Sequence, residues 1–136
     1  MERYPLVECI EEDGVLIAYI ARAEKMPEKS EFITPDDVKQ QVGFIVYPAG
    51  GEIARHVHVP IERHLVGTSE VLLVRKGLVE VDLYTQEKRL VGTWQLRTGD
   101  LLLLVSGGHG FRCIEDSILL EVKQGPYTGL REKEHF

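Results

Sequence analysis

Two apolar runs follow each other in the stretch EVLLVRKGLVEVDLY, residues 70–84. The first, Val71 to Arg75, is rich in β-branched and aliphatic residues, and the second, Leu78 to Tyr84, alternates between apolar and polar. Such runs are typical of β-strands, because successive side chains on a strand point to opposite faces. The stretch therefore predicts two neighbouring strands joined at Lys76-Gly77.

The same signals recur along the chain. Leu6 to Ile10 and Val15 to Ala21 flank an acidic turn that ends in Asp13-Gly14, which predicts a hairpin. Further strands are expected at residues 42–47, 53–59, 90–96, 101–105, 110–114 and 118–123. About ten short strands with turn signals roughly every 8–12 residues indicate an all-β sandwich or barrel. A closed barrel or jelly roll is favoured because closure removes exposed strand edges.

The length of 136 residues suits a single domain, expected to cover residues 1–136. We expect this domain to consist of an N-terminal hairpin at residues 6–21, a core barrel at 42–123 and a turn-rich C-terminal tail at 124–136. The only helix candidate, residues 35–41, is too short to change the fold class.

Composition excludes several classes of function. The formal net charge of −6 argues against a nucleic-acid or anionic membrane surface, which requires clustered Lys and Arg. No apolar run approaches the roughly 20 residues that span a bilayer, and the N-terminus lacks a signal-peptide pattern. With Cys9 and Cys113 as the only cysteines, a disulfide scaffold is not expected. We therefore expect a protein of the reducing cytoplasm.

Histidines supply the strongest functional signal. His56 and His58 stand two apart in the expected strand 53–59, so both imidazoles and the small Ala54 share one face. Two imidazoles placed in this way can bind one metal ion.

Two later strands offer further ligands. Glu70 begins a strand on which it shares a face with Leu72 and Val74, and His109 shares a face with Phe111 and Cys113. Three imidazoles and one carboxylate suit a divalent transition metal with a position left open for water or substrate. The expected metal is Fe, Mn, Ni, Cu or Zn, and the expected pocket lining is Ala54, Leu72, Val74, Phe111 and Cys113.

Each residue alone also has a structural interpretation. A single buried histidine is more often a core residue with its hydrogen bonds satisfied than a ligand, which applies above all to His64. Glu62 alone is explained as a loop charge. Cys113 is interpreted as a small buried apolar residue, since no activating group is near it in sequence.

The motifs resemble those of the cupin family, whose first motif is G-x5-H-x-H-x3,4-E-x6-G. Gly50 precedes His56 by five intervening residues, and Glu70 stands before Gly77 with six between. The second motif is matched in part by residues 99–109, from Gly99-Asp100 to His109. The resemblance covers residues 42–123 and implies a double-stranded β-helix, or jelly-roll barrel, with a metal bound by His56, His58, one glutamate and His109.

The chain departs from the cupin pattern at four places, one of which is a residue missing between Gly107 and His109. Eleven residues separate His58 from Glu70 where three or four are usual, which is explained by an insertion over residues 59–69. Glu62 meets the short spacing, so Glu62 and His64 are alternate ligands to Glu70. Val105 stands where the pattern has proline, and Cys113 where it has asparagine.

The resemblance implies several functions, because one fold hosts many. We expect a metal-binding enzyme that acts on a small polar molecule. One alternative is a metal-independent sugar-nucleotide ketoisomerase or epimerase that uses the histidine pair as acid and base; another is a non-catalytic module that binds or senses a small molecule. The apolar side chains of Ile53, Val57 and Val59 on the outward face of their strand predict a homodimer.

Overall fold

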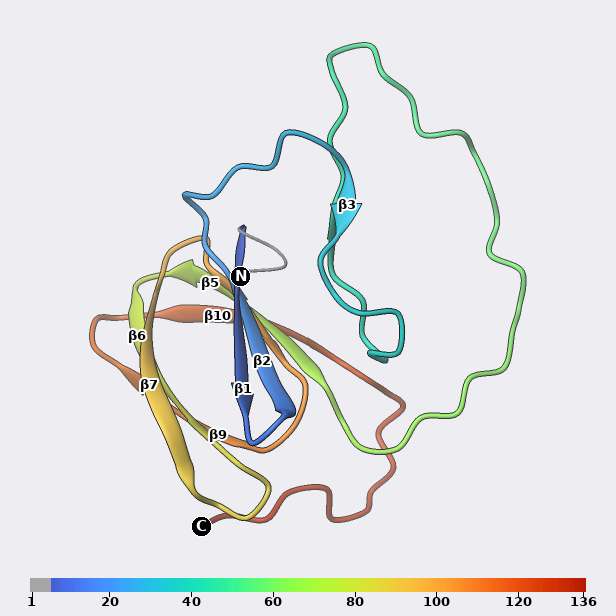
Figure 1. Cartoon of the computed structure of the whole chain (residues 1–136). Coiled ribbons are helices and arrows are strands. Elements are labelled where there is room, and N and C mark those ends of the chain that lie inside the picture. Colours follow the sequence, from blue (N-terminus) through green and yellow to red (C-terminus); the bar gives the residue numbers. More distant parts are fainter. Residues whose placement is uncertain (1–5) are drawn as a thin grey trace.

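Strands make up the regular structure of the computed structural model, which describes residues 6–136 (Figure 1). Ten strands and no helix lie in this range, so the all-β prediction is confirmed. The strands are β1 (Val7–Glu12), β2 (Val15–Ala21), β3 (Glu31–Phe32), β4 (Gly43–Phe44), β5 (Glu70–Lys76), β6 (Leu78–Tyr84), β7 (Leu90–Arg97), β8 (Leu101–Leu104), β9 (Gly108–Cys113) and β10 (Ile118–Lys123). A bilayer-spanning helix is therefore not found among these residues.

The strands form three antiparallel sheets. The largest has the order β1-β2-β8-β5-β10, the second the order β7-β6-β9, and β3 pairs with β4 alone. We call the two larger sheets the body. Their strands are not joined into a closed barrel by backbone pairing within residues 6–136. The predicted hairpin is present as β1 and β2, and its turn residues Asp13 and Gly14 have the positive φ angles, 52° and 76°, that a two-residue hairpin turn favours.

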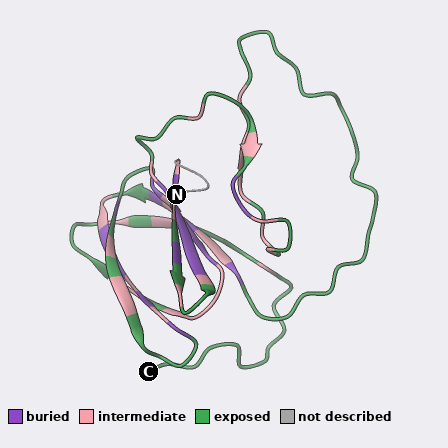
Figure 2. Ribbon diagram, viewed as in Figure 1, coloured by how far each residue is buried: buried purple, intermediate pink, exposed green. Residues whose placement is uncertain are grey.

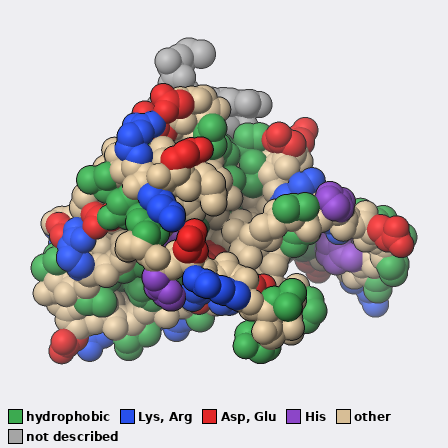
Figure 3. Space-filling model, turned by 90° about the horizontal axis from the view of Figure 1, so that it is seen from below, with side chains coloured by type: hydrophobic (Ala, Val, Ile, Leu, Met, Phe, Trp, Pro, Cys, Tyr) green, Lys and Arg blue, Asp and Glu red, His purple; other side chains and the backbone are tan. Residues whose placement is uncertain are grey.

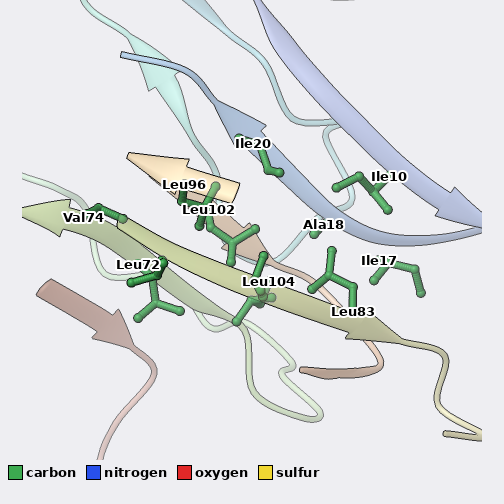
Figure 4. Packing of buried hydrophobic residues seen from close by; sticks show 12 residues of the cluster. Ile10, Ile17, Ala18, Ile20, Leu72, Val74, Leu83, Leu96, Leu102 and Leu104 are labelled. Carbon is green, nitrogen blue, oxygen red and sulfur yellow. The ribbon is translucent and has the colours of Figure 1, made fainter. Parts of the chain in front are cut away.

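The core lies between the two sheets of the body. An inner cluster of aliphatic side chains fills this space, with Leu72 and Leu102 contributed by the five-stranded sheet and Leu83 and Leu96 by the three-stranded sheet (Figure 4). Each such side chain stabilises the fold by roughly 1.5–3 kcal/mol when it is fully removed from water. The two sheets therefore pack face to face as a sandwich.

An outer cluster covers the opposite face of the five-stranded sheet. It consists of Val7, Tyr19, Ala21, Ile33 and Leu103. Val42 and Phe44, from the segment around β4, pack against it. Because β8 is covered on both faces, its sequence is a continuous leucine run and not an alternating one.

A buried carboxylate holds the turn between β7 and β8. Asp100 accepts hydrogen bonds from the backbone N–H of Arg97 at 2.8 Å and of Ala23 at 2.9 Å. The Arg22 guanidinium, which also pairs with Glu8, donates to the same carboxylate at 3.2 Å. These contacts satisfy polar groups that burial would otherwise leave unpaired.

The strand predicted at residues 53–59 is not formed. Residues 47–68, which we call the arm, are all exposed and have no regular secondary structure (Figure 2). The strand predicted at 42–47 is likewise reduced to the two residues of β4. A strand is stable only when a neighbour pairs with its backbone, and one backbone–backbone hydrogen bond, from Gly51 N–H to Pro48 C=O, forms within the arm.

Candidate functional site

Glu70 and His109 face each other between the two sheets of the body. Glu70 is the first residue of β5 and His109 lies on β9, and Glu70 Oε2 is 3.8 Å from His109 Nε2. The exposed fraction is 12% for the Glu70 side chain and 32% for that of His109. Two of the four predicted metal ligands therefore lie side by side at a partly open edge of the core.

Strand register explains this placement. Glu70 alternates on β5 with Leu72 and Val74, both of which are buried in the inner cluster. His109 is paired with Leu83 of β6, and paired residues of neighbouring antiparallel strands share a face. Since Leu83 is also buried in the inner cluster, both polar side chains point into the space between the sheets.

Glu121 of β10 joins this pair and was not predicted from the sequence. It is paired with Leu72, so it shares the inner face, and it is close enough to Glu70 to raise the pKa of that carboxyl group. The sequence does carry a signal for Glu121: side chains alternate along residues 118–123, which places Leu119, Glu121 and Lys123 on one face.

The pKa of Glu70 is raised from 4.5 to about 7. Burial is the largest cause, and hydrogen bonding and charge repulsion from Glu121 add to it, while Lys123 and Lys133 oppose it. Burial also lowers the pKa of His109 below its usual value. The body therefore favours the neutral form of the His109 imidazole beside a Glu70 carboxyl group whose protonated form is favoured.

His56 and His58 lie elsewhere, on the arm. Their rings are 5.2 Å apart in an edge-to-face arrangement, and His56 Nδ1 lies 2.8 Å from the carbonyl oxygen of Ala54. If Nδ1 carries the proton it donates this hydrogen bond, which leaves Nε2 free as a ligand. Figure 3 shows histidine side chains on the part of the molecule that projects from the body.

The remaining predicted residues divide between arm and body. The alternate ligands Glu62 and His64 are on the arm, as is Ala54, and all three are exposed. Of the predicted lining, Leu72 and Val74 are core residues. Two further lining residues lie on β9. Phe111 packs on the core with its ring centroid 5.8 Å from that of His109. The interpretation of Cys113 as a buried apolar residue is wrong, since this last residue of β9 is exposed.

The structure thus brings together half of the expected ligand set. Across residues 6–136, no three His, Cys, Asp or Glu side chains are grouped closely enough to hold a metal ion. No protein-family model, curated protein or solved structure matches this chain.

A separate hollow of about 590 Å³ lies where the arm rejoins the body. It includes none of the predicted ligands and is lined by Glu11, Leu16, Tyr19, Pro35, Asp37, Val38, Lys39, Leu65, Val66, Gly67, Thr68, Ser69, Gln86, Val105, Ser106 and Gly107.

Proposed function

We propose that this protein is a metal-binding cupin that acts as an enzyme on a small polar molecule. Its metal ligands are Glu70 and His109 of the body and His56 and His58 of the arm. The observation that carries the proposal is the contact of Glu70 with His109 across two sheets, at positions that the sequence motifs single out independently.

The proposal requires the arm to complete a jelly roll. β9 and β10 are edge strands of their sheets, and the side chains of the Glu70–Glu121–His109 group come from these two strands and from β5. An edge strand presents unpaired N–H and C=O groups that can accept another strand. Residues 53–59 would add to the free edge of β9, with His56 and His58 facing inward beside His109.

The donor set fits a divalent transition metal. Burial lowers the pKa of His109 and so favours its neutral, metal-binding form. If His56 donates from Nδ1 to the carbonyl of Ala54, its Nε2 is available as a ligand. Imidazole and carboxylate ligands together suit Fe, Mn, Ni, Cu or Zn. When bound, such an ion supplies Lewis acidity or an oxygen-activating centre.

Metal titration tests the proposal. Metal-stripped protein is titrated with Mn²⁺, Ni²⁺ and Zn²⁺ in a calorimeter, and we expect one equivalent to bind. His109→Ala and His58→Ala should each weaken metal binding at least about 100-fold. Loss of a residue that only hydrogen-bonds to a metal ligand typically lowers metal affinity about 10–100-fold, and loss of the ligand itself should lower it more. Glu62→Gln and His64→Ala serve as matched controls and should bind as the unchanged protein does. Absence of binding, or a larger loss in Glu62→Gln than in Glu70→Gln, contradicts the assignment.

A second candidate function is metal-independent acid–base chemistry on a sugar nucleotide. The observation that favours it is the pKa of Glu70, which at about 7 suits proton transfer at neutral pH. Metal-stripped protein would be incubated in D₂O with nucleotide-linked keto-sugars. Deuterium incorporation that persists in chelator and is lost in Glu70→Gln would favour this function over the metal-dependent one.

A further inference from the structure

Residues 125–136 leave the five-stranded sheet beside Glu70. Lys123, the last residue of β10, is paired with Glu70 of β5. The next residue, Gln124, fixes this end of the segment: its side chain accepts a hydrogen bond of 2.7 Å from the Ser69 N–H and donates one of 3.0 Å to Ser69 Oγ. In Figure 1 the segment leaves β10 and returns beneath the body toward the turn between β6 and β7.

The far end of this segment is held beside His109. The Phe136 ring lies against Gly108, the residue before His109, because a Cβ atom added to this glycine would be 3.0 Å from the ring. An ion pair of 3.4 Å between Lys88 and Glu134 holds the same end. The segment is therefore anchored on both sheets of the body.

These anchors take the segment across the open edge of the core at Glu70 and His109, which we call the mouth. Glu70 Oε2 and His109 Nε2 are 3.8 Å apart, so a chain held beside both residues passes over the opening between them. The charge of Lys133 reaches both groups. Burial is the largest cause of the shift in each pKa, and Lys133 opposes the rise at Glu70 and adds to the fall at His109.

The protein charges around Glu70 nearly cancel. Its carboxyl group is acted on by a second carboxyl group, that of Glu121, and by the ammonium groups of Lys123 and Lys133. The ion pairs among residues 6–136 include neither lysine, so both keep N–H donors for a ligand. A divalent ion bound at the mouth brings further positive charge, which a small anion would offset.

We propose that residues 125–136 form a strap over the mouth and that Lys133, on this strap, binds an anionic group of the substrate. A carboxylate and a phosphate both suit this role, since both accept hydrogen bonds from an ammonium group. The strap also shields the Glu70–His109 pair from bulk water. This inference rests on the proposed function, because the anion offsets the charge of the metal ion.

Chemical labelling of His109 tests the strap in metal-stripped protein. Diethyl pyrocarbonate is added at pH 7, and mass spectrometry measures the rate of modification at each histidine, with those of the arm as internal reference. Phe136→Ala/Glu134→Gln releases the far end of the strap, so His109 should react several times faster. Tyr127→Ala/Glu132→Gln alters exposed residues of the same strap and should leave the rate unchanged. Equal rates at His109 in the first variant and the unchanged protein overturn the strap.

Anion titration tests the role of Lys133. Acetate and methyl phosphate are titrated into the Mn²⁺-loaded protein in a calorimeter, and the probe that binds more tightly identifies the anionic group. Lys133→Met should weaken this binding about tenfold, because a charge-assisted hydrogen bond is lost, whereas Lys133→Arg should retain most of it. Lys29→Met removes an exposed lysine outside the strap and is the matched control. Unchanged affinity in Lys133→Met, or binding of neither anion, overturns the role of Lys133.

The two measurements separate the failures. If releasing the strap speeds the modification of His109 but Mn²⁺ does not bind, the strap stands and the anion-binding role falls with the proposed function. If Mn²⁺ binds and Lys133→Met leaves the anion affinity unchanged, the proposed function stands and the role of Lys133 is wrong. If the His109 rate does not change on release, the strap is wrong whether or not metal binds.

Discussion

Replacing Glu121 with glutamine tests the electrostatic coupling between the carboxyl groups of Glu70 and Glu121. The shift in the pKa of Glu70 makes the stability of the fold depend on pH, and this dependence fixes the direction of the expected effect. The pKa of Glu70 in the folded protein, about 7, lies above its usual value of 4.5, so the folded state holds a proton that the unfolded state releases between these values. Stability therefore falls as pH rises through this window. The penalty is absent below about pH 4.5 and complete above about pH 7.

The size of the effect follows from the causes of the shift. Raising the pKa from 4.5 to about 7 corresponds to at most about 3 kcal/mol, and solvent screening of this partly exposed carboxyl group reduces the cost to about 2 kcal/mol. Burial is the largest cause and persists in Glu121→Gln, whereas the charge repulsion from Glu121 is removed. The amide can also donate a hydrogen bond to the Glu70 carboxylate. We expect the metal-free variant to gain about 1 kcal/mol at pH 8 and almost nothing at pH 5.

Urea denaturation at both pH values, in the presence of a chelator, measures this difference. Glu115→Gln removes an exposed carboxylate outside the pair and is the matched control, with equal stability changes at the two pH values. A gain for Glu121→Gln that is the same at pH 5 and pH 8 would refute the coupling of the two carboxyl groups, as would a loss of stability at pH 8.

Substitutions of Asp100, Gly107 and Phe136 probe the fold. Asp100→Ala leaves two backbone N–H groups without an acceptor and should lower the free energy of unfolding by about 3 kcal/mol in urea, with a smaller loss for Asp100→Asn. Gly107→Ala places a methyl group against the backbone of Tyr84 at a φ of 78° and should lower Tm strongly, whereas Gly110→Ala, which meets open space, should leave Tm within a few degrees. Phe136→Ala removes a ring contact with Tyr84 and should speed protease cleavage of the C-terminal tail while the body stays intact; an unchanged cleavage rate would argue against this anchor.

Local pattern was sufficient to predict most of the strands. The runs at residues 71–75 and 78–84 and the hairpin around Asp13-Gly14 carry both the period of a strand and clear turn residues, and all three are formed. Residues 53–59 have the same period but no strand. Periodicity records which face a side chain would take; whether another strand lies alongside is decided by distant parts of the chain.

The candidate site shows the same division. Alternation on one strand was enough to place Glu70 and His109 on inward faces, and the structure brings them together. The pattern of residues 118–123 alone does not single out Glu121, because its role depends on which strand pairs with β10. Its register opposite Leu72, and hence its contact with Glu70, is a property of the sheet order. Local sequence pattern likewise does not predict where His56 and His58 lie relative to the body.

Both ends of the arm are held independently of what lies between them. Phe44 packs on the outer cluster, and the Ser69 N–H donates a hydrogen bond of 2.7 Å to Gln124 Oε1. The chain entropy lost on closing such a loop grows only with the logarithm of its length, so doubling the arm would cost the body about 0.6 kcal/mol. The eleven residues between His58 and Glu70 therefore lower the free energy of unfolding of the sandwich very little. The segment that carries His56 and His58 can change in length while the sheets that carry Glu70 and His109 stay the same.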